Sequence, residues 1–316
     1  MTYRTQTILD VTYATIDGRE MLADLFLPET SRRVPAIIFI SGDTQAAGDR
    51  TRTPDLPSFF ADAGFAMIGI DHRSISDASF PAAVEDVRTA IRWLRQAASE
   101  FNIDPDRIGL WGFSGGGQLA VLSQTLPRLP YKDDGYADVS DRVQAVVASY
   151  GSTEMSEDDT GRARNAGTVT ALDSTQRARI GSVADDGERF AGSPVNQTPQ
   201  KANTENPVCH IGQARLPPIL ILDGLADTAV PDHQSRQLFN TLARNRQQAM
   251  LMLIEGLRPG FLDCEDIAAT GQHTVHVRRT AGCEPSIERR CIHTTIHQFF
   301  ARCFAAVTVS AAAIRA

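Results

Sequence analysis

Six short, continuous apolar runs constrain the fold of this chain more than any other feature of its sequence. They are of strand length and lie at residues 36–40, 66–70, 108–111, 145–148, 219–222 and 250–254. Such runs are typical of parallel strands whose two faces are both covered. Helical patterns follow several of them, over residues 81–98, 118–126 and 232–244, and a last helix is expected over 287–304. Strands that alternate with helices predict an α/β fold with a mostly parallel, doubly covered sheet.

The rest of the chain predicts a single domain over residues 1–316 with two irregular stretches. Alternating residues from Val11 to Leu27, with Asp17-Gly18 at the turn, predict a β-hairpin before the first apolar run. Residues 152–206 are polar and predict a cap over a site, with a long surface loop as the alternative. Residues 260–286 are expected to form an atypical loop before the last helix.

Composition and charge exclude several kinds of partner. The net charge of −7 leaves no basic face for a nucleic acid. No apolar run reaches the roughly 18 to 20 residues that span a bilayer, and the N-terminus lacks the features of a secretory signal. We therefore expect a small-molecule substrate, no cofactor and a cytoplasmic location. The five cysteines lack zinc-site spacing and are expected to be free thiols, with a Cys264–Cys283 bridge as the alternative.

The segment from Arg107 to Gly117 carries the strongest chemical signal. An apolar strand leads into Gly-x-Ser-x-Gly, centred on Ser114, and then into a helix. A chain that turns this sharply needs small neighbours, and the turn places the serine above the sheet at the helix N-terminus. The pattern predicts that Ser114 is a nucleophile, and a glycine-rich structural turn is the alternative.

A candidate acid follows the apolar run at 219–222. Asp227 lies in the loop after this run, at the carboxyl edge where open α/β sheets place their sites. A carboxylate there can orient a histidine and stabilise its cation. Asp223 is the alternative acid, and we expect it to make a structural hydrogen bond instead.

From about Gly18 to Phe261 the chain resembles the acetyl-esterase and feruloyl-esterase-like branch of the α/β hydrolases, which borders the dienelactone hydrolases and the prolyl-oligopeptidase-type peptidases. The matching phrases are Asp71-His72-Arg73, Phe80 to Val87, Asp104 to Gly109, Gly112 to Gly116, Ser193-Pro194-Val195 and Gly224 to Pro231. The resemblance implies an α/β-hydrolase fold with Ser114 as nucleophile and Asp227 as the triad acid. It also implies that the Gly115 amide is one oxyanion donor.

Two positions depart from the pattern of that branch. Ser41-Gly42-Asp43-Thr44 replaces the His-Gly-Gly-Gly phrase that supplies further oxyanion amides. The amides of Gly42 and Asp43 are the candidates here, although the Asp43 carboxylate would oppose an oxyanion unless it points away or is protonated. Pro259 replaces the catalytic histidine after the last long strand and cannot accept a proton.

This replacement leaves the general base open. His273 and His276 lie between the last expected strand and the last expected helix, where either could fold back to Ser114. His273, beside Gly271, is the first candidate, because His276 alternates with valines as on a strand face. The absence of any histidine base is the other possibility. The remaining histidines have no predicted catalytic role: His72, His210, His233, His293 and His297.

Three functions are compatible with these residues. The first is a serine hydrolase that acts on a small ester, lactone or acyl compound through an acyl-Ser114 intermediate with an atypical triad. The second is a lyase, cyclase or isomerase of a biosynthetic pathway in which Ser114 only donates a hydrogen bond. The third is a binding protein without turnover. The intact Gly-x-Ser-x-Gly turn favours the hydrolase.

Overall fold

The computed structural model describes residues 3–42, 50, 60–74, 77–127, 135–136, 138–151, 204–228, 230–258, 260, 271–280 and 284–314. Its strands are β1 (Thr5–Ile16), β2 (Arg19–Pro28), β3 (Val34–Ile40), β4 (Ala66–Ile70), β5 (Ile103–Phe113), β6 (Ala145–Ser149), β7 (Ile219–Gly224), β8 (Ala249–Ile254), β9 (His273–Arg279) and β10 (Ser286–Arg290). Its helices are α1 (Ala82–Gln96), α2 (Gly115–Thr125), the short η4 (Pro207–His210), α6 (Asp232–Arg244) and α8 (Ile292–Ile314).

All ten strands belong to one sheet, in the order β1-β2-β4-β3-β5-β6-β7-β8-β9-β10. The strands from β4 to β8 in this order are parallel to one another. The β1–β2 hairpin adds antiparallel to β4 at one edge, and β9 and β10 add antiparallel to β8 at the other. The predicted α/β fold and N-terminal hairpin are therefore confirmed, and each of the six apolar runs is a strand.

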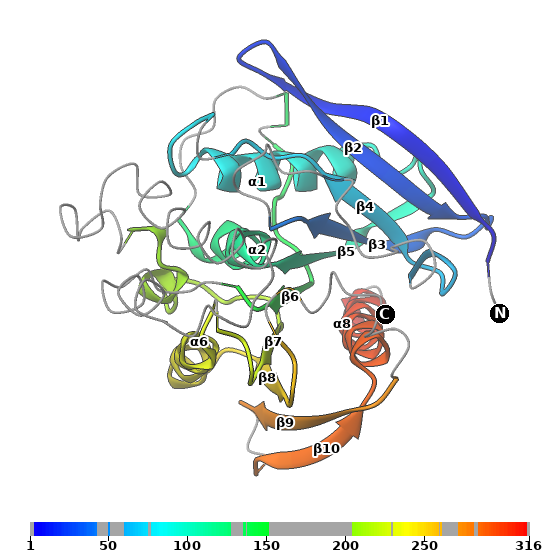
Figure 1. Cartoon of the computed structure of the whole chain (residues 1–316). Helices are drawn as coiled ribbons and strands as arrows, with labels where there is room; N and C mark the ends of the chain where they lie inside the picture. Colours follow the sequence, from blue (N-terminus) through cyan, green and yellow to red (C-terminus); the bar gives the residue numbers. More distant parts are fainter. Residues whose placement is uncertain are drawn as a thin grey trace.

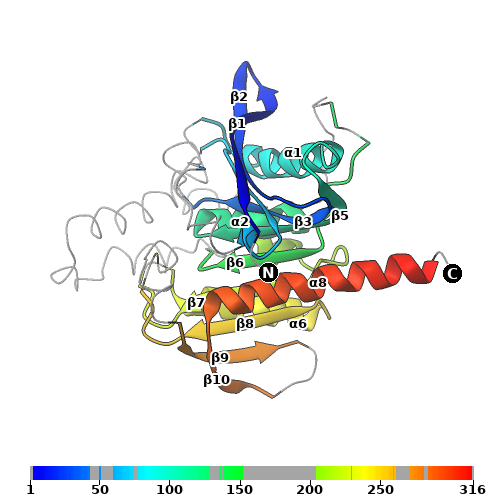
Figure 2. The same cartoon turned by 90° about the vertical axis from the view of Figure 1, so that its right-hand side faces the viewer.

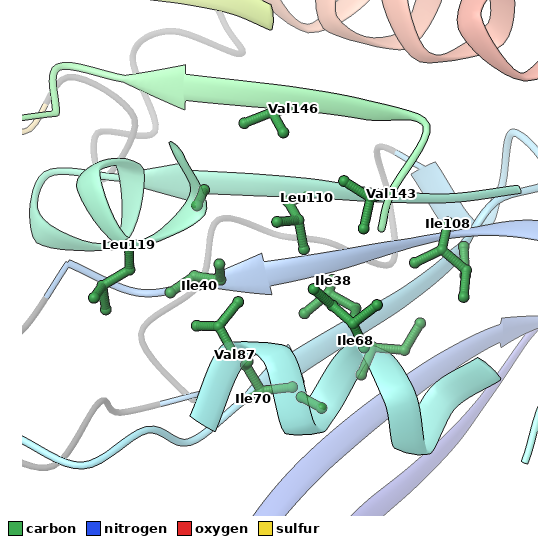
Figure 3. Close-up of a cluster of buried hydrophobic side chains, with 14 of the residues drawn as sticks. Ile38, Ile40, Ile68, Ile70, Val87, Ile108, Leu110, Leu119, Val143 and Val146 are labelled. Atoms are coloured by element: carbon green, nitrogen blue, oxygen red, sulfur yellow. The ribbon is translucent and has the colours of Figure 1, made fainter. Parts of the chain in front are cut away.

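Helices cover both faces of this sheet (Figures 1 and 2). Helices α1, α2 and α6 lie on one face and α8 on the other. Figure 3 shows the first of these interfaces, where Ile38, Ile68 and Leu110 of the sheet meet Val87 of α1 and Leu119 of α2. Burial on both faces explains why the central strands are continuous apolar runs rather than alternating ones.

Helix α8 packs closely on the other face because β5 carries a glycine there. A Cβ atom at Gly109 would lie 2.5 Å from the ring of Phe300, so only glycine leaves room for that ring. Phe300 stacks on Phe304 one turn further along α8, with ring centroids 5.8 Å apart. The helix is thereby held against the middle of the sheet.

The C-terminal part differs from the sequence prediction. Residues 286–290 form the edge strand β10, and the last helix begins at Ile292. The prediction that this helix begins at residue 287 is therefore wrong. The stretch expected to be a loop over 260–286 also contains β9. None of the β10 residues is buried, so this strand leaves no apolar pattern in the sequence.

Several predictions concern residues outside the described ranges: most of the cap (residues 152–203), Asp43, Thr44, Pro259, Cys264 and Cys283. The three described cysteines, Cys209, Cys291 and Cys303, are not joined in disulfides. Within the described ranges, no helix has the length and apolar character to span a bilayer. Nor do the described residues contain a group of three or more histidine, cysteine or acidic side chains that could hold a metal ion.

Candidate active site

Ser114 lies at the corner where β5 ends and α2 begins, as the sequence predicts. Its backbone has φ 52° and ψ −128°, a conformation that residues other than glycine rarely adopt. The corner is held by main-chain hydrogen bonds from Ser114 N to Ser149 O (2.9 Å) and from Gly117 N to Ser114 O (3.0 Å). The residue is half-buried, and its side chain makes no capping hydrogen bond to α2. Its hydroxyl is therefore presented at the carboxyl edge of the sheet.

Three glycines allow the backbone to approach this corner. A Cβ atom at Gly112 would lie 2.1 Å from the carbonyl oxygen of Gly116, and one at Gly116 would lie 2.2 Å from that of Ile40. A Cβ atom at Gly42 would lie 2.6 Å from the Cβ of Ser114. The end of β3 and the start of α2 thus pack directly on the serine. A side chain at any of the three glycine positions would clash with neighbouring atoms.

Two backbone amides beside Ser114 are candidate oxyanion donors. The Gly115 amide belongs to the first turn of α2, where N–H groups have no acceptor within the helix and the helix dipole favours negative charge. Gly42 lies against Ser114 at the end of β3. His72 supports this loop from the interior, with Nε2 3.3 Å from the carbonyl oxygen of Ser41. The predicted donor at Asp43 lies outside the described residues.

Asp227 lies in a tight turn after β7. Its side chain is only 8% exposed, and its Oδ1 accepts a hydrogen bond from the backbone N of Val230 at 2.9 Å. The backbone N of Ala226 donates to Leu257 O at 3.1 Å, which joins this turn to the loop after β8. Leu257 is two residues before Pro259, so the loop in which the resembling branch carries its histidine begins beside Asp227.

The sequence matches the BD-FAE family over residues 23–242, which is most of the chain and runs from within β2 to within α6. The chain belongs to the BD-FAE family. The match includes both Ser114 and Asp227.

Several relatives of this BD-FAE chain are esterases. LipM of Mycobacterium tuberculosis, named as a probable carboxylic ester hydrolase, is 28% identical over 69% of this chain and 47% of its own length. The esterase LipQ of the same organism is 27% identical over 80% of this chain and 56% of its own length. The chain thus spans about half the length of these two curated relatives. A truncated form of a carbohydrate esterase from gut microbiota has a similar structure, with 28% identity and a TM-score of 0.65 over 84% of this chain and 93% of its own. The α/β-hydrolase fold is therefore confirmed.

Asp223 of this BD-FAE chain is engaged in structural hydrogen bonds, as expected. It is fully buried at the end of β7. Its Oδ2 accepts a hydrogen bond from Ser235 Oγ of α6 at 2.6 Å, and its Oδ1 accepts one from Gly224 N at 2.8 Å. Burial raises the pKa of Asp223 to about 7, the Ser235 hydrogen bond opposes the rise, and the charge of Asp227 adds to it.

Tyr150 is a site-edge residue that the sequence analysis did not identify. It follows β6, the strand between β5 and β7, and so stands between the corner at Ser114 and the turn at Asp227. Its φ is 38°, its ring lies 5.8 Å from that of Phe113, and its N–H donates to Leu222 O at 2.6 Å. Its position two residues after the apolar run at 145–148 was the available signal.

The structure does not bring His273 or His276 to Ser114. His273 is the first residue of β9 rather than part of a loop, and β9 is four strands from β5. At about 4.8 Å per strand this is roughly 19 Å. His276 Nε2 lies 2.8 Å from Glu255 Oε1 on the outer part of the sheet. Among the described side chains, none is hydrogen-bonded to the Ser114 hydroxyl.

The other histidines of this BD-FAE chain have separate surroundings. His293 at the start of α8 is buried, and that burial lowers its pKa to about 4. The His297 ring packs against the ring of Phe65 at 4.8 Å. His210 Nε2 lies 2.7 Å from the carbonyl oxygen of Thr204, and His233 is exposed near the start of α6.

Proposed function

We propose that this chain hydrolyses a small carboxylic ester through Ser114. The observation that carries the proposal is the backbone of Ser114, held at a positive φ by main-chain bonds and glycine contacts. Strain of this kind persists where the surrounding structure enforces it, and it is typical of functional residues. The esterase relatives support the same reaction class.

In the proposed reaction the Ser114 Oγ attacks the carbonyl carbon of the ester. The carbonyl oxygen becomes an oxyanion beside the amides of Gly115 and Gly42, and donors placed in advance are worth several kcal/mol at such a site, roughly 2.7–4 each. The bond to the alcohol oxygen then breaks, the alcohol leaves with a proton, and an acyl group remains on Ser114. Water attacks the acyl carbon and releases the acid. Asp227 supplies a buried negative charge that stabilises positive charge developing on the proton acceptor.

We propose that the proton of Ser114 passes to water rather than to a histidine. Pro259 replaces the histidine of the resembling branch, and the histidines of β9 are remote from Ser114. A general base contributes roughly 10²–10⁴-fold to a rate. Oxyanion donors and binding alone retain about 10³–10⁴-fold over the reaction in water. We therefore expect measurable but slow turnover.

Substitution of the two β9 histidines tests this part of the proposal. His273→Asn and His276→Asn should each keep the rate of p-nitrophenyl acetate hydrolysis within about twofold, because neither side chain takes the serine proton. A hundredfold fall in kcat for His273→Asn alone would instead identify His273 as the base.

Substitution of the nucleophile tests the function itself. Ser114→Ala should reduce turnover of p-nitrophenyl acetate to the rate without enzyme, since no acyl intermediate can form. Ser123→Ala is the matched control: Ser123 lies on the same helix, and its buried hydroxyl donates to Ala120 O at 2.8 Å and accepts from Gln124 Nε2 at 3.3 Å. Retention of most turnover by Ser114→Ala would contradict hydrolysis through an acyl-Ser114 intermediate.

A further inference from the structure

We propose that Asp223 is a positioning residue for Asp227 and that the two carboxyl groups together carry a single negative charge near neutral pH. This inference rests on the proposed function, because it assumes that Asp227 acts in the reaction at Ser114. Its structural part can be tested without turnover.

The Asp223 side chain joins three elements beneath the candidate site. Through Ser235 Oγ it contacts α6, and through Gly224 N it holds the first residue of the turn that carries Asp227. That same turn closes when the N–H of Asp227 donates to Gly224 O at 3.0 Å. Asp223 thus fixes the start of the turn, and Asp227 closes it four residues later.

The neighbouring loop leaves this turn no room to shift. A Cβ atom at Gly224 would lie 2.5 Å from Leu257 O, and Leu225 N donates to Ile254 O at 2.9 Å. The turn is therefore held between α6 on one side and the end of β8 on the other. A change at Asp223 should be transmitted to Asp227, because the short turn between them has no alternative packing.

The charges around Asp223 disfavour a second carboxylate. Asp227 acts on it from the turn after β7 and Asp232 from the start of α6, and both raise its pKa. On β8 the residue opposite Asp223 is the apolar Leu253. The favourable contributions come from the Ser235 hydroxyl and the Gly224 amide, and they do not offset burial. A proton held by Asp223 removes the repulsion and leaves Asp227 as the charged member of the pair.

This arrangement gives a definite dependence of stability on pH. The pKa of Asp223 is raised in the folded chain, so folding favours its protonated form. The stability that this proton provides is present at low pH and is lost as the pH rises toward 7. Asp223→Asn keeps a group of the same shape that is neutral at every pH, so it removes this loss.

The first experiment compares thermal unfolding of the native chain and Asp223→Asn at pH 5 and pH 8. The advantage in Tm of Asp223→Asn over the native chain should be larger at pH 8 than at pH 5 by roughly 3 °C or more. Glu100→Gln is the control, because it removes an exposed acid after α1 that is not among the charges acting on Asp223, and it should show no such step. An advantage that is the same at both pH values would overturn the shared charge.

The second experiment measures kcat and KM for p-nitrophenyl acetate against pH. The ratio of kcat for Asp223→Asn to that of the native chain should rise threefold or more between pH 6 and pH 8.5, with KM unchanged. Only the native chain gains a second negative charge in the Asp223–Asp227 pair over this range. Ser235→Ala should lower kcat through a less well held turn, and Ser235→Thr should restore it. Equal pH profiles, or a Ser235→Thr variant no better than Ser235→Ala, would overturn the positioning role.

The Tm comparison is repeated in a Ser114→Ala background, which separates this inference from the proposed function. If the step in Tm persists in the Ser114→Ala background and the native chain shows no esterase activity, the shared charge is supported and the proposed function is wrong. If the native chain shows esterase activity but no step in Tm, the proposed function is supported and the shared charge is wrong.

Discussion

At the scale of single residues, the conformation of Ser114 depends on what surrounds it rather than on its own side chain. Its hydroxyl caps nothing, whereas Gly42, Gly112 and Gly116 let three backbone segments meet at the corner. Each of these contacts is with main-chain atoms or with Ser114 itself, which cannot move aside without changing the turn. The glycines are thus as much a part of the site as the serine.

Two adjacent glycines of α2 provide a direct test of this point. Gly116→Ala should destabilise the chain by roughly 1–3 kcal/mol and abolish esterase turnover, because the new Cβ meets the carbonyl oxygens of Ile40 at 2.2 Å and Ser41 at 2.5 Å. Gly117→Ala is the control, since its nearest neighbour would be at 3.2 Å. Urea unfolding and p-nitrophenyl acetate turnover measure both effects, and equal behaviour of the two variants would contradict the steric account.

At the scale of elements, buried ion pairs connect α1 to the loop after β4. Asp86 of α1 is fully buried and accepts hydrogen bonds from the guanidinium of Arg73 at 2.7 and 3.0 Å and from its backbone N at 2.8 Å. The same loop contains His72, which lies against Ser41 in front of Gly42. The placement of α1 is in this way linked to the loop that carries a candidate oxyanion donor.

Removal of one member of this pair should be costly. Asp86→Asn is expected to destabilise the chain by about 3–5 kcal/mol, because it removes the nearest and buried counter-ion of Arg73 and leaves the exposed Asp17 at 3.9 Å. Asp104→Asn is the matched control in the partly exposed Arg107–Asp104 pair and should cost about 0.2–1 kcal/mol. Denaturant midpoints for the two variants measure the difference. Similar losses of stability would show that the buried Asp86 pair stabilises the chain no more than the partly exposed Asp104 pair.

The elements that could be predicted from the sequence are those buried on both sides. The strands from β3 to β8 appear as apolar runs, and α6 has the predicted bounds because its apolar residues repeat at helical spacing. Strand β10 could not be predicted in this way. Its stability comes from pairing with β9 and from Glu288, whose side chain accepts hydrogen bonds from Arg290, Ser286 and Arg279.

At the scale of the whole molecule, one sheet covered on both faces brings separate parts of the chain to a single edge. The parallel strands β5, β6 and β7 end there in succession, and they place Ser114, Tyr150 and Asp227 in that order along the edge. The sequence predicts Ser114 and Asp227 because each follows an apolar run in a recognisable phrase. It does not predict the positive φ of Tyr150 or the link from Asp223 to Ser235, since these depend on contacts between strands and helices distant in the sequence.

The central claim is that Ser114 is a nucleophile, and covalent labelling tests it most directly. The native chain is incubated with a fluorophosphonate ester, and the modified residue is located by mass spectrometry of its peptides. We expect one phosphonyl group per chain, attached to Ser114, and no labelling of Ser114→Ala. Two results would contradict the account. One is a native chain that stays unmodified at Ser114, and the other is equal labelling of the native chain and Ser114→Ala at some other residue.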